Sequence, residues 1–423
     1  MIVIGAGITG LATAWNYKQQ APGRTVRVVD RVAAAASPLQ ASAVNCGILC
    51  HEAASGTPGE KLMMKLTWAE ARGLGEEVKF VVTGSLTPCL TAKEVAWAQA
   101  WVRTENLGGY GPSDIRYVDR EEALELEPAL GGDVLGALYH PKAAHCNPKH
   151  FLRAIYKRCL QIGVEMSLGE AVTDIQYNEE QDEYNVVTNR TAAYHCKKLV
   201  LATGAGSHHI GQLLGVTIPV VPVRGTMWST KPLAQGKLKT LVFSAEAGAF
   251  WNQHNKALMQ RGVPPSVSHA LGGERMTHHL YLKQTHDGCI IGGGDRVVVN
   301  LNAAPNFPVD GEAVQSNKAF ASTLLPMLKD HGVKRTWTGV MPFTPDGRGL
   351  VGRLNCLKGQ VYIISGLASH GLMQGPGAGK LLAGLMCGDQ IAAAVLQEAD
   401  PDRVIKRTTT IKQNVGTPPL ARM

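Results

Sequence analysis

The 423-residue chain is long enough for two domains with large hydrophobic cores, because 45% of its residues are hydrophobic and 18% are charged. Its lysines and arginines give a formal net charge of +8 but are dispersed, apart from Lys406-Arg407, so a basic solvated surface is favoured and no nucleic-acid partner is expected. No hydrophobic run approaches the roughly 18 residues of a membrane span. Because a strand is predicted to start at Met1, we expect either a protein made without an N-terminal address or a clipped chain.

The first element is an apolar strand that runs directly into three spaced glycines, Gly5, Gly7 and Gly10. Gly5 permits a tight turn, Gly7 lets a pyrophosphate approach the backbone, and Gly10 lets the following helix pack on the strand. A second apolar strand ends at Asp30, 20 residues beyond Gly10, where a carboxylate can accept a hydrogen bond from a ribose hydroxyl. The whole arrangement predicts a dinucleotide site at a helix N-terminus.

Helical periodicity then alternates with segments of small and turn-forming residues. Helices are predicted over residues 65–78, 92–106, 147–164 and 317–333. The third helix begins with Asn147 as its N-cap and Pro148 in the first position. A polar stretch marked by proline and glycine precedes it and ends near residue 141.

The strands of the second half alternate apolar and polar residues, which is typical of antiparallel sheets with one buried face. Strands are predicted within residues 165–178, 183–189, 193–202, 218–230, 278–285 and 288–296. Residues 231–275 show little periodicity and are interpreted as either a lid or a surface insertion.

The fold class expected from this order is α/β, with a dinucleotide-binding domain that is interrupted in sequence and a second, antiparallel β-rich domain. The first domain is assigned to residues 1–80, 145–215 and 335–395, the second to 81–144 and 216–334, and a C-terminal tail to 396–423.

Nine cysteines are scattered along the chain without CxxC pairs, and the odd number argues against a disulfide framework. A reducing compartment fits this pattern. Cys46 and Cys50 lie four residues apart beside His51, but no further ligands follow at a suitable spacing, so no metal is expected.

Five segments in this order resemble the FAD-dependent D-amino-acid oxidase superfamily, which includes glycine oxidase, sarcosine oxidase and bacterial D-amino-acid dehydrogenase. The resemblance covers nearly the whole chain and implies a Rossmann-type FAD-binding domain with a smaller antiparallel β domain over the flavin. The segments are "VIGAGITGLATAW", Ser42-x-x-Asn45-x-Gly47, "VLATGAG", "WTGVMPFTPDGRGLVG" and "GLASHGLMQGPGAGKLLAGL".

The resemblance implies roles in holding FAD for residues of four of the five segments and for two residues outside them, Asp30 and Val172. It gives the pyrophosphate to the three N-terminal glycines, the ribose to Asp30 and the adenine to the backbone of Val172. Thr203 and Gly204 match a strand-end turn beside the cofactor, and Asn45 and Gly47 match the segment along the isoalloxazine ring. The loop and helix start near the pyrimidine edge of the flavin are matched by Gly371, Leu372, Met373 and Gly375. The N-terminus of a helix that starts near Gly371 would stabilise the negative charge of reduced flavin.

The reaction that the resemblance implies removes a hydride from a carbon bearing nitrogen and delivers it to flavin N5, leaving an imine that water hydrolyses. Oxygen or another electron acceptor then reoxidises the flavin. Because the amine lone pair drives the transfer, positioning is the main catalytic task. His370 is the candidate for a catalytic or flavin-tuning role through hydrogen bonding. Gly339 stands where monomeric sarcosine oxidases present a linking Cys, so non-covalent FAD is expected.

The two cations that related enzymes use to bind a substrate carboxylate are missing. Met341, just before a proline, replaces the Arg of amino-acid oxidases, and Met373 replaces the Lys of sarcosine-oxidase-like members. Burying a carboxylate without a cation costs several kcal/mol. Bulkier or less acidic amines are therefore expected as substrates, unless Arg224, Arg275 or Lys283 supplies the charge.

Plainer interpretations of the same residues stay open. Asp30 would then be an ordinary strand-end acid, His370 a core histidine, Arg224 a structural residue at a strand end, and the later glycines helix-packing positions. Two other functions also remain: a flavin-dependent tRNA-modification enzyme and a non-enzymatic assembly factor with a flavin fold. The expected location is the cytoplasm, with a peroxisomal address in Ala421-Arg422-Met423 as the alternative.

Overall fold

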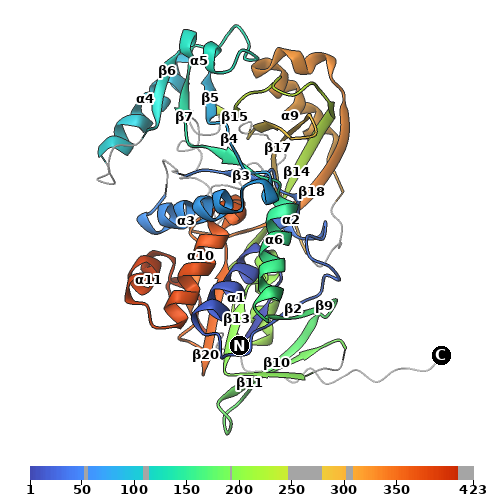
Figure 1. Ribbon diagram of the computed structural model, residues 1–423, viewed down its shortest axis with the longest axis vertical. Coiled ribbons are helices and arrows are strands. Elements are labelled where there is room, and N and C mark those ends of the chain that lie inside the picture. Colours follow the sequence, from blue (N-terminus) through green and yellow to red (C-terminus); the bar gives the residue numbers. More distant parts are fainter. Residues whose placement is uncertain (52–55, 108–113, 191–192, 246–278, 302–307, 408–423) are drawn as a thin grey trace, which may run out of the picture.

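The computed structural model describes residues 1–51, 56–107, 114–190, 193–245, 279–301 and 308–407. Two large sheets dominate these residues, and they lie in the lower and upper parts of the view in Figure 1. Both sheets are built from segments that are far apart in the sequence.

The lower sheet has six strands with β1 in an inner position. Its order is β19 (Leu350–Arg353), β20 (Gln360–Ser365), β13 (Lys198–Leu201), β1 (Ile2–Ile4), β2 (Arg27–Asp30) and β9 (Glu165–Leu168). All neighbours are parallel except β19, which pairs antiparallel with β20 at one edge. The chain leaves β1 toward β2 on one side and later adds β13 on the other, which makes a topological switch point at their carboxyl ends.

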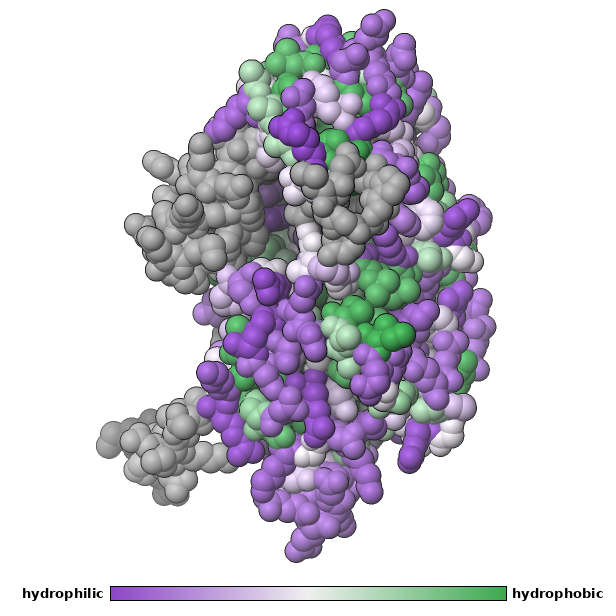
Figure 2. All heavy atoms as spheres, turned by 90° about the vertical axis from the view of Figure 1, so that its left-hand side faces the viewer, coloured by the Kyte–Doolittle hydropathy of each residue, from purple (hydrophilic) through white to green (hydrophobic). Residues whose placement is uncertain are grey.

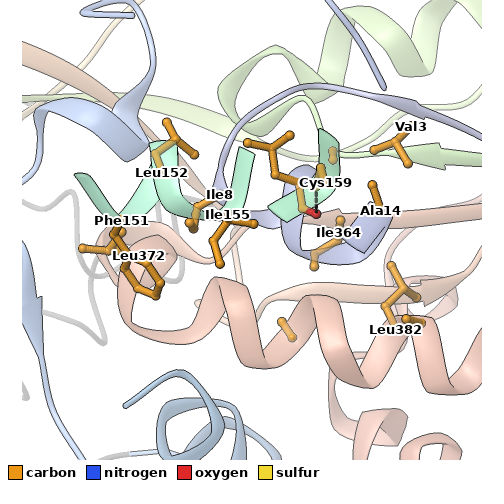
Figure 3. Close-up of a cluster of buried hydrophobic side chains, with 14 of the residues drawn as sticks. Val3, Ile8, Ala14, Phe151, Leu152, Ile155, Cys159, Ile364, Leu372 and Leu382 are labelled. Carbon is orange, nitrogen blue, oxygen red and sulfur yellow. Dashed lines mark hydrogen bonds between the residues drawn. The ribbon is translucent and has the colours of Figure 1, made fainter. Parts of the chain in front are cut away.

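Three helices pack close together against this sheet, as Figures 1 and 3 show. They are α1 (Ile8–Gln20), α6 (Pro148–Gln161) and α10 (Gly371–Met386). Phe151, Leu152 and Ile155 of α6 are fully buried among apolar residues of the other two helices, and the Cys159 thiol lies 3.3 Å from the Leu11 carbonyl oxygen. This core fixes the N-terminus of α1 over the carboxyl ends of the strands.

The upper sheet has eight strands, and every neighbouring pair except β15 and β5 is antiparallel. The helix α9 (Gly311–Leu324) packs on it, where Trp228 Nε1 donates a 2.8 Å hydrogen bond to Asn317 Oδ1. The order is β18 (Val333–Phe343), β14 (Val221–Pro232), β17 (Cys289–Val298), β16 (Tyr281–Gln284), β15 (Leu241–Phe243), β5 (Ser85–Cys89), β7 (Gly136–His140) and β6 (Arg116–Asp119).

Smaller elements complete the described chain. The antiparallel sheet of β10 (Val172–Asn178), β11 (Glu183–Thr188) and β12 (Ala193–Cys196) lies beside the six-stranded sheet, and β3 (Ile48–Leu49), β8 (Ala144–His145) and β4 (Val81–Val82) form another. The remaining α-helices are α2 (Ala41–Val44), α3 (Pro58–Leu74), α4 (Ala92–Leu107), α5 (Arg120–Leu126), α7 (Ser207–Leu213) and α11 (Gln390–Val395).

The expected α/β class is confirmed, but several expected elements differ in extent. The helix predicted over 317–333 ends at Leu324, because Pro326 cannot continue it and disfavours helical geometry at the residue before it. The polar stretch before residue 141 contains β6, α5 and β7, and the start of the aperiodic 231–275 segment contains β15. Residues 246–275 of that segment lie outside the described residues.

The sheets also show how the proposed domains interleave. The strand β18 pairs with β14 in the upper sheet, although the range 335–395 was assigned to the FAD-binding domain. The change from one sheet to the other falls between Phe343 and Leu350. The division into domains stays a proposal.

Hydrophilic residues dominate the face in Figure 2, with hydrophobic residues in separate groups. In the part of the chain that the structure describes, no helix is both long and apolar enough to cross a membrane. All nine cysteines are described, and each is a free thiol.

Candidate active site

The glycine loop after β1 is held by the neighbouring strands. Gly5 has φ +115°, and a Cβ there would lie 2.3 Å from the Ala202 carbonyl oxygen; a Cβ at Gly10 would lie 2.0 Å from the Gly5 oxygen. At Gly7, by contrast, an added Cβ would meet only Ser42 Oγ, at 3.4 Å. Gly5 and Gly10 are thus required by packing, whereas Gly7 leaves an open place beside the helix N-terminus.

Asp30 ends β2 next to this loop and is half-buried. Its Oδ2 accepts a hydrogen bond from Ala6 N at 2.6 Å, and its Oδ1 accepts one from Val32 N at 3.0 Å. A carboxylate has about four lone-pair sites, so two bonds to the backbone leave capacity for a ribose hydroxyl. Asp30 therefore braces the turn and still presents an acceptor.

The loop after β2 returns to the start of α1. Ser42 Oγ accepts a 3.1 Å hydrogen bond from Ile8 N, and Asn45 Oδ1 accepts a 2.8 Å bond from Gly47 N. Gly47 has φ +75°, and a Cβ there would lie 2.1 Å from the Cys146 carbonyl oxygen. The predicted segment of Asn45 and Gly47 is therefore fixed close to the glycine loop, with Ser42 linking the two.

The end of β13 forms another glycine turn. Gly204 has φ +52°, and its carbonyl oxygen accepts hydrogen bonds from Ser207 Oγ at 2.7 Å and Ser365 Oγ at 3.2 Å. Thr203 Oγ1 donates to the Ser207 hydroxyl at 3.2 Å. Because β13 is next to β1, this turn stands beside the glycine loop at the carboxyl edge of the sheet.

A second helix N-terminus, that of α10, lies against the first. A Cβ at Gly375 would lie 3.1 Å from the Cγ2 atoms of both Ile8 and Thr9, so the absence of a side chain brings the first turns of α10 and α1 together. No heavy atom lies within 4 Å of the Cβ position of Gly371, and Leu372 is buried in the core. The positive ends of two helix dipoles therefore meet at this edge, which favours bound negative charge.

Val172, the residue expected at the adenine, is buried at the start of β10. The turn before it is fixed to β2, because Glu170 N donates a 2.9 Å hydrogen bond to the Asp30 carbonyl oxygen. The backbone just before Val172 thus lies close to Asp30, at the carboxyl end of β2.

One face of the upper sheet lies over the loop of residues 41–47. Trp337 Nε1 donates a 2.8 Å hydrogen bond to the Val44 carbonyl oxygen, and a Cβ at Gly339 would lie 2.8 Å from Val44 Cγ2. Residues two apart on a strand share a face, so Met341 lies on this face too. It packs with Val223 and Phe343. We refer to this surface of β14, β16, β17 and β18 as the roof face.

The roof face does not include Arg224, one candidate of the sequence analysis. Its neighbour Val223 packs in the roof-face cluster with Met341, and successive side chains of a strand point to opposite sides. Arg224 is buried and donates a 2.8 Å hydrogen bond from Nη1 to the Pro308 carbonyl oxygen.

The other two candidate cations differ in their placement. Lys283 is buried, and its Nζ donates a 3.0 Å hydrogen bond to the Cys146 carbonyl oxygen, near Gly47. Burial lowers the pKa of Lys283. Arg275 lies outside the described residues.

Two roof-face residues were missed by the sequence analysis, Tyr281 and Arg296. Tyr281 packs against the same buried cluster as Met373, and its hydroxyl donates to Met227 Sδ at 2.8 Å. Burial raises the pKa of Tyr281, which keeps it protonated. Arg296 Nη2 donates to Ser369 Oγ at 3.3 Å. The strand register that places Arg296 on this face is not visible in the sequence, where Arg296 is the last residue of the strand predicted over 288–296.

His370 immediately precedes α10, and part of its side chain is exposed to solvent. The protein atoms around the imidazole nevertheless reduce its hydration, and the nearby Arg296 guanidinium repels a positive charge on the ring. Both effects lower the pKa of His370, to about 4. The imidazole is therefore neutral at physiological pH, which suits hydrogen bonding rather than ionic attraction.

This pKa leads to a prediction about stability. Between pH 4 and 6.5 the unfolded chain binds more protons at His370 than the folded chain, so the stability contribution is present above pH 6.5 and is lost as the pH falls toward 4. Urea unfolding at pH 7 and pH 4.5 measures it. A His370→Gln variant should lose less stability between these values than the wild type, and an equal loss in both proteins would contradict the lowered pKa.

These residues fit a dinucleotide with a redox-active ring. The open position at Gly7 beside a helix N-terminus fits a pyrophosphate, Asp30 fits a ribose, and the second helix N-terminus lies under the roof face where a ring that gains negative charge would be stabilised. The fold and the site thus define a nucleotide-dependent oxidoreductase with a second, antiparallel sheet over the cofactor.

The comparisons name the family. The sequence matches the family described as FAD dependent oxidoreductase over residues 1–385, and the chain belongs to that family. It is 25% identical to a glycine oxidase of Pseudomonas aeruginosa over 405 residues, covering 92% of this chain and 94% of that protein. The expected superfamily, the enzyme class and FAD as the cofactor are confirmed.

Other similarities extend this finding. The chain is 24% identical to the bifunctional protein ThiO/ThiG of a Nostoc species over 417 residues, which is 97% of this chain; it spans about half the length, 56%, of that relative. The fold matches glycine oxidase from Geobacillus kaustophilus with a TM-score of 0.75 at 18% identity, covering 97% and 98% of the two chains. It also matches L-proline dehydrogenase from P. horikoshii with a TM-score of 0.72 at 22% identity, covering 95% and 96%.

Proposed function

We propose that this FAD-dependent oxidoreductase oxidises the carbon–nitrogen bond of an amine or amino acid to an imine, which water then hydrolyses. The observation that carries this proposal is the meeting of the α1 and α10 N-termini beneath a mostly apolar roof face. When bound, FAD supplies the hydride acceptor, at N5 of its ring. The glycine oxidase among the relatives acts on an amino acid by its name, which agrees with this class of substrate.

The chain's own contribution is orientation and exclusion of water. The half-buried side chains of Met341, Met373 and Tyr281 give the substrate an apolar surface, and methionines adapt to different shapes. Neutral His370 offers a hydrogen bond at the edge of this surface. Holding a neutral amine in one orientation provides most of the rate enhancement that this reaction needs from the protein.

Anaerobic reduction of the flavin tests the proposal. The purified protein is mixed with primary amines, N-methyl amino acids and D-amino acids, and the visible flavin absorbance is followed. We expect at least one class to bleach the flavin and to yield a carbonyl product in equal amount. If dithionite bleaches the flavin but no amine does, C–N oxidation is not its reaction.

The acceptor and the location are also proposals. We propose oxygen or another electron acceptor, and the rate of flavin reoxidation in air measures whether oxygen serves. The cytoplasm remains the proposed location, and the alternative signal at 421–423 lies outside the described residues. The tRNA-modification alternative predicts a salt-dependent mobility shift with RNA, and we expect none because the basic residues are dispersed.

A further inference from the structure

The strand register places Arg296 on the roof face beside the two positions where the expected cations are missing. Gly225 of β14 pairs with Arg296 of β17 on one side and with Gly339 of β18 on the other. Directly paired residues share a face, so the Arg296 side chain starts on the same side as Gly339 and Met341. Neither glycine carries a side chain that would block it.

The guanidinium then extends toward the N-terminus of α10. Its Cζ lies 5.6 Å from the centroid of the Phe343 ring, and its Nη2 contacts Ser369 Oγ at 3.3 Å, one residue before His370. Phe343 belongs to the same cluster as Met341. Met341 on β18 carries no charge, but Arg296 on β17, two strands away in the sheet, places a positive charge on the same face.

Most N–H groups of the Arg296 guanidinium remain available to a ligand. Among the side chains that the structure describes, no carboxylate forms an ion pair with Arg296, and the Ser369 hydroxyl accepts one of its five N–H groups. Arginine stays charged in proteins, and a half-buried guanidinium is poorly hydrated. Its planar pair of donors matches the two oxygens of a carboxylate.

We propose, on the basis of the function proposed above, that Arg296 binds the carboxylate of the substrate and that the substrates are amino acids rather than simple amines. The expectation of less acidic substrates rested on Met341 and Met373 alone and did not include this residue. The apolar side chains beside Arg296 then receive the rest of the amino acid, with its Cα toward the neutral His370.

The test measures ligand binding to the FAD-loaded protein rather than enzymatic turnover. The FAD-loaded protein is titrated with acetate, propionate and benzoate, and with acetamide, propionamide and benzamide as neutral analogues, while the visible absorbance of the flavin reports binding. We expect the carboxylates to bind the wild type, and the Arg296→Met variant to bind them on the order of 100-fold more weakly with amide binding unchanged. Equal carboxylate affinity in both proteins, or no response of the wild type to any carboxylate, overturns the proposal.

Two further variants complete the experiment. Arg24→Met makes the same substitution at an exposed position before β2, at the opposite end of that strand from Asp30, and it should bind carboxylates like the wild type. If Arg296→Met does not retain FAD, Arg296→Lys is used, and binding about tenfold weaker for carboxylates only is expected because lysine cannot form two parallel hydrogen bonds; unchanged affinity for both ligand classes refutes the proposal.

This titration separates the two proposals. A flavin that binds carboxylates through Arg296 but is reduced by no amine contradicts the proposed function and leaves the anion site intact. A flavin that amino acids reduce equally well in the wild type and in Arg296→Met supports the function and removes Arg296 from it.

Discussion

Replacing Gly7 by valine is expected to abolish FAD binding and to leave the fold intact. Gly7 has φ −73° and ψ 177°, an extended conformation that valine adopts readily. Its added Cβ would meet only Ser42 Oγ at 3.4 Å, so the protein itself has room for it. The space it fills is the one that the pyrophosphate needs. We expect FAD affinity to fall on the order of 100-fold or more, about 3 kcal/mol.

Acid precipitation shows both how much FAD each protein binds and whether the FAD is covalently attached. The wild type should release a yellow supernatant, because Gly339 cannot form a thioether link to flavin. Gly7→Val should be colourless and fail to take up added FAD, with an unchanged circular dichroism spectrum. Gly23→Val is the matched control, since no atom lies within 4 Å of its Cβ position. Equimolar FAD in Gly7→Val, or flavin in the wild-type pellet, would count against these expectations.

The cofactor site was largely readable from the sequence because its parts are local. The glycine loop, Asp30 and the start of α10 each combine a glycine pattern with the element on which it acts, and backbone geometry limits what such patterns can form. The structure brings these three parts to one edge of the six-stranded sheet.

The substrate side could not be read in the same way. Whether Arg224 or Arg296 faces the roof depends on strand register, and a shift of one residue exchanges the two faces of a strand. The bulge in β17 between the partners of Thr226 and Met227 adds to this uncertainty, because it changes the alternation within the strand. Sequence spacing contains neither the register nor the bulge.

Replacing Gly10 by alanine should destabilise the fold, whereas replacing Gly7 by valine should impair FAD binding and leave the fold intact. In an ordinary helix position, Gly→Ala would stabilise by up to about 1 kcal/mol, because alanine has the higher helix propensity. At Gly10 the new methyl would lie 2.0 Å from the Gly5 carbonyl oxygen and 3.1 Å from Ala202 Cβ. Backbone at both sides cannot move without displacing β1, so the clash outweighs the propensity and costs about 3 kcal/mol or more.

Thermal unfolding of the FAD-free proteins checks this prediction, since bound FAD would itself stabilise the fold. Gly10→Ala should lower Tm by roughly 3 °C or more, or prevent accumulation of folded protein. Gly7→Val and Gly23→Val should both have a Tm close to that of the wild type. The nearest atom to the Cβ position of Gly7 is 3.4 Å away, and no atom lies within 4 Å of that of Gly23. A Gly10→Ala protein as stable as the wild type would show that α1 can move away from β1, and the close packing of the glycine loop would not be a condition for folding.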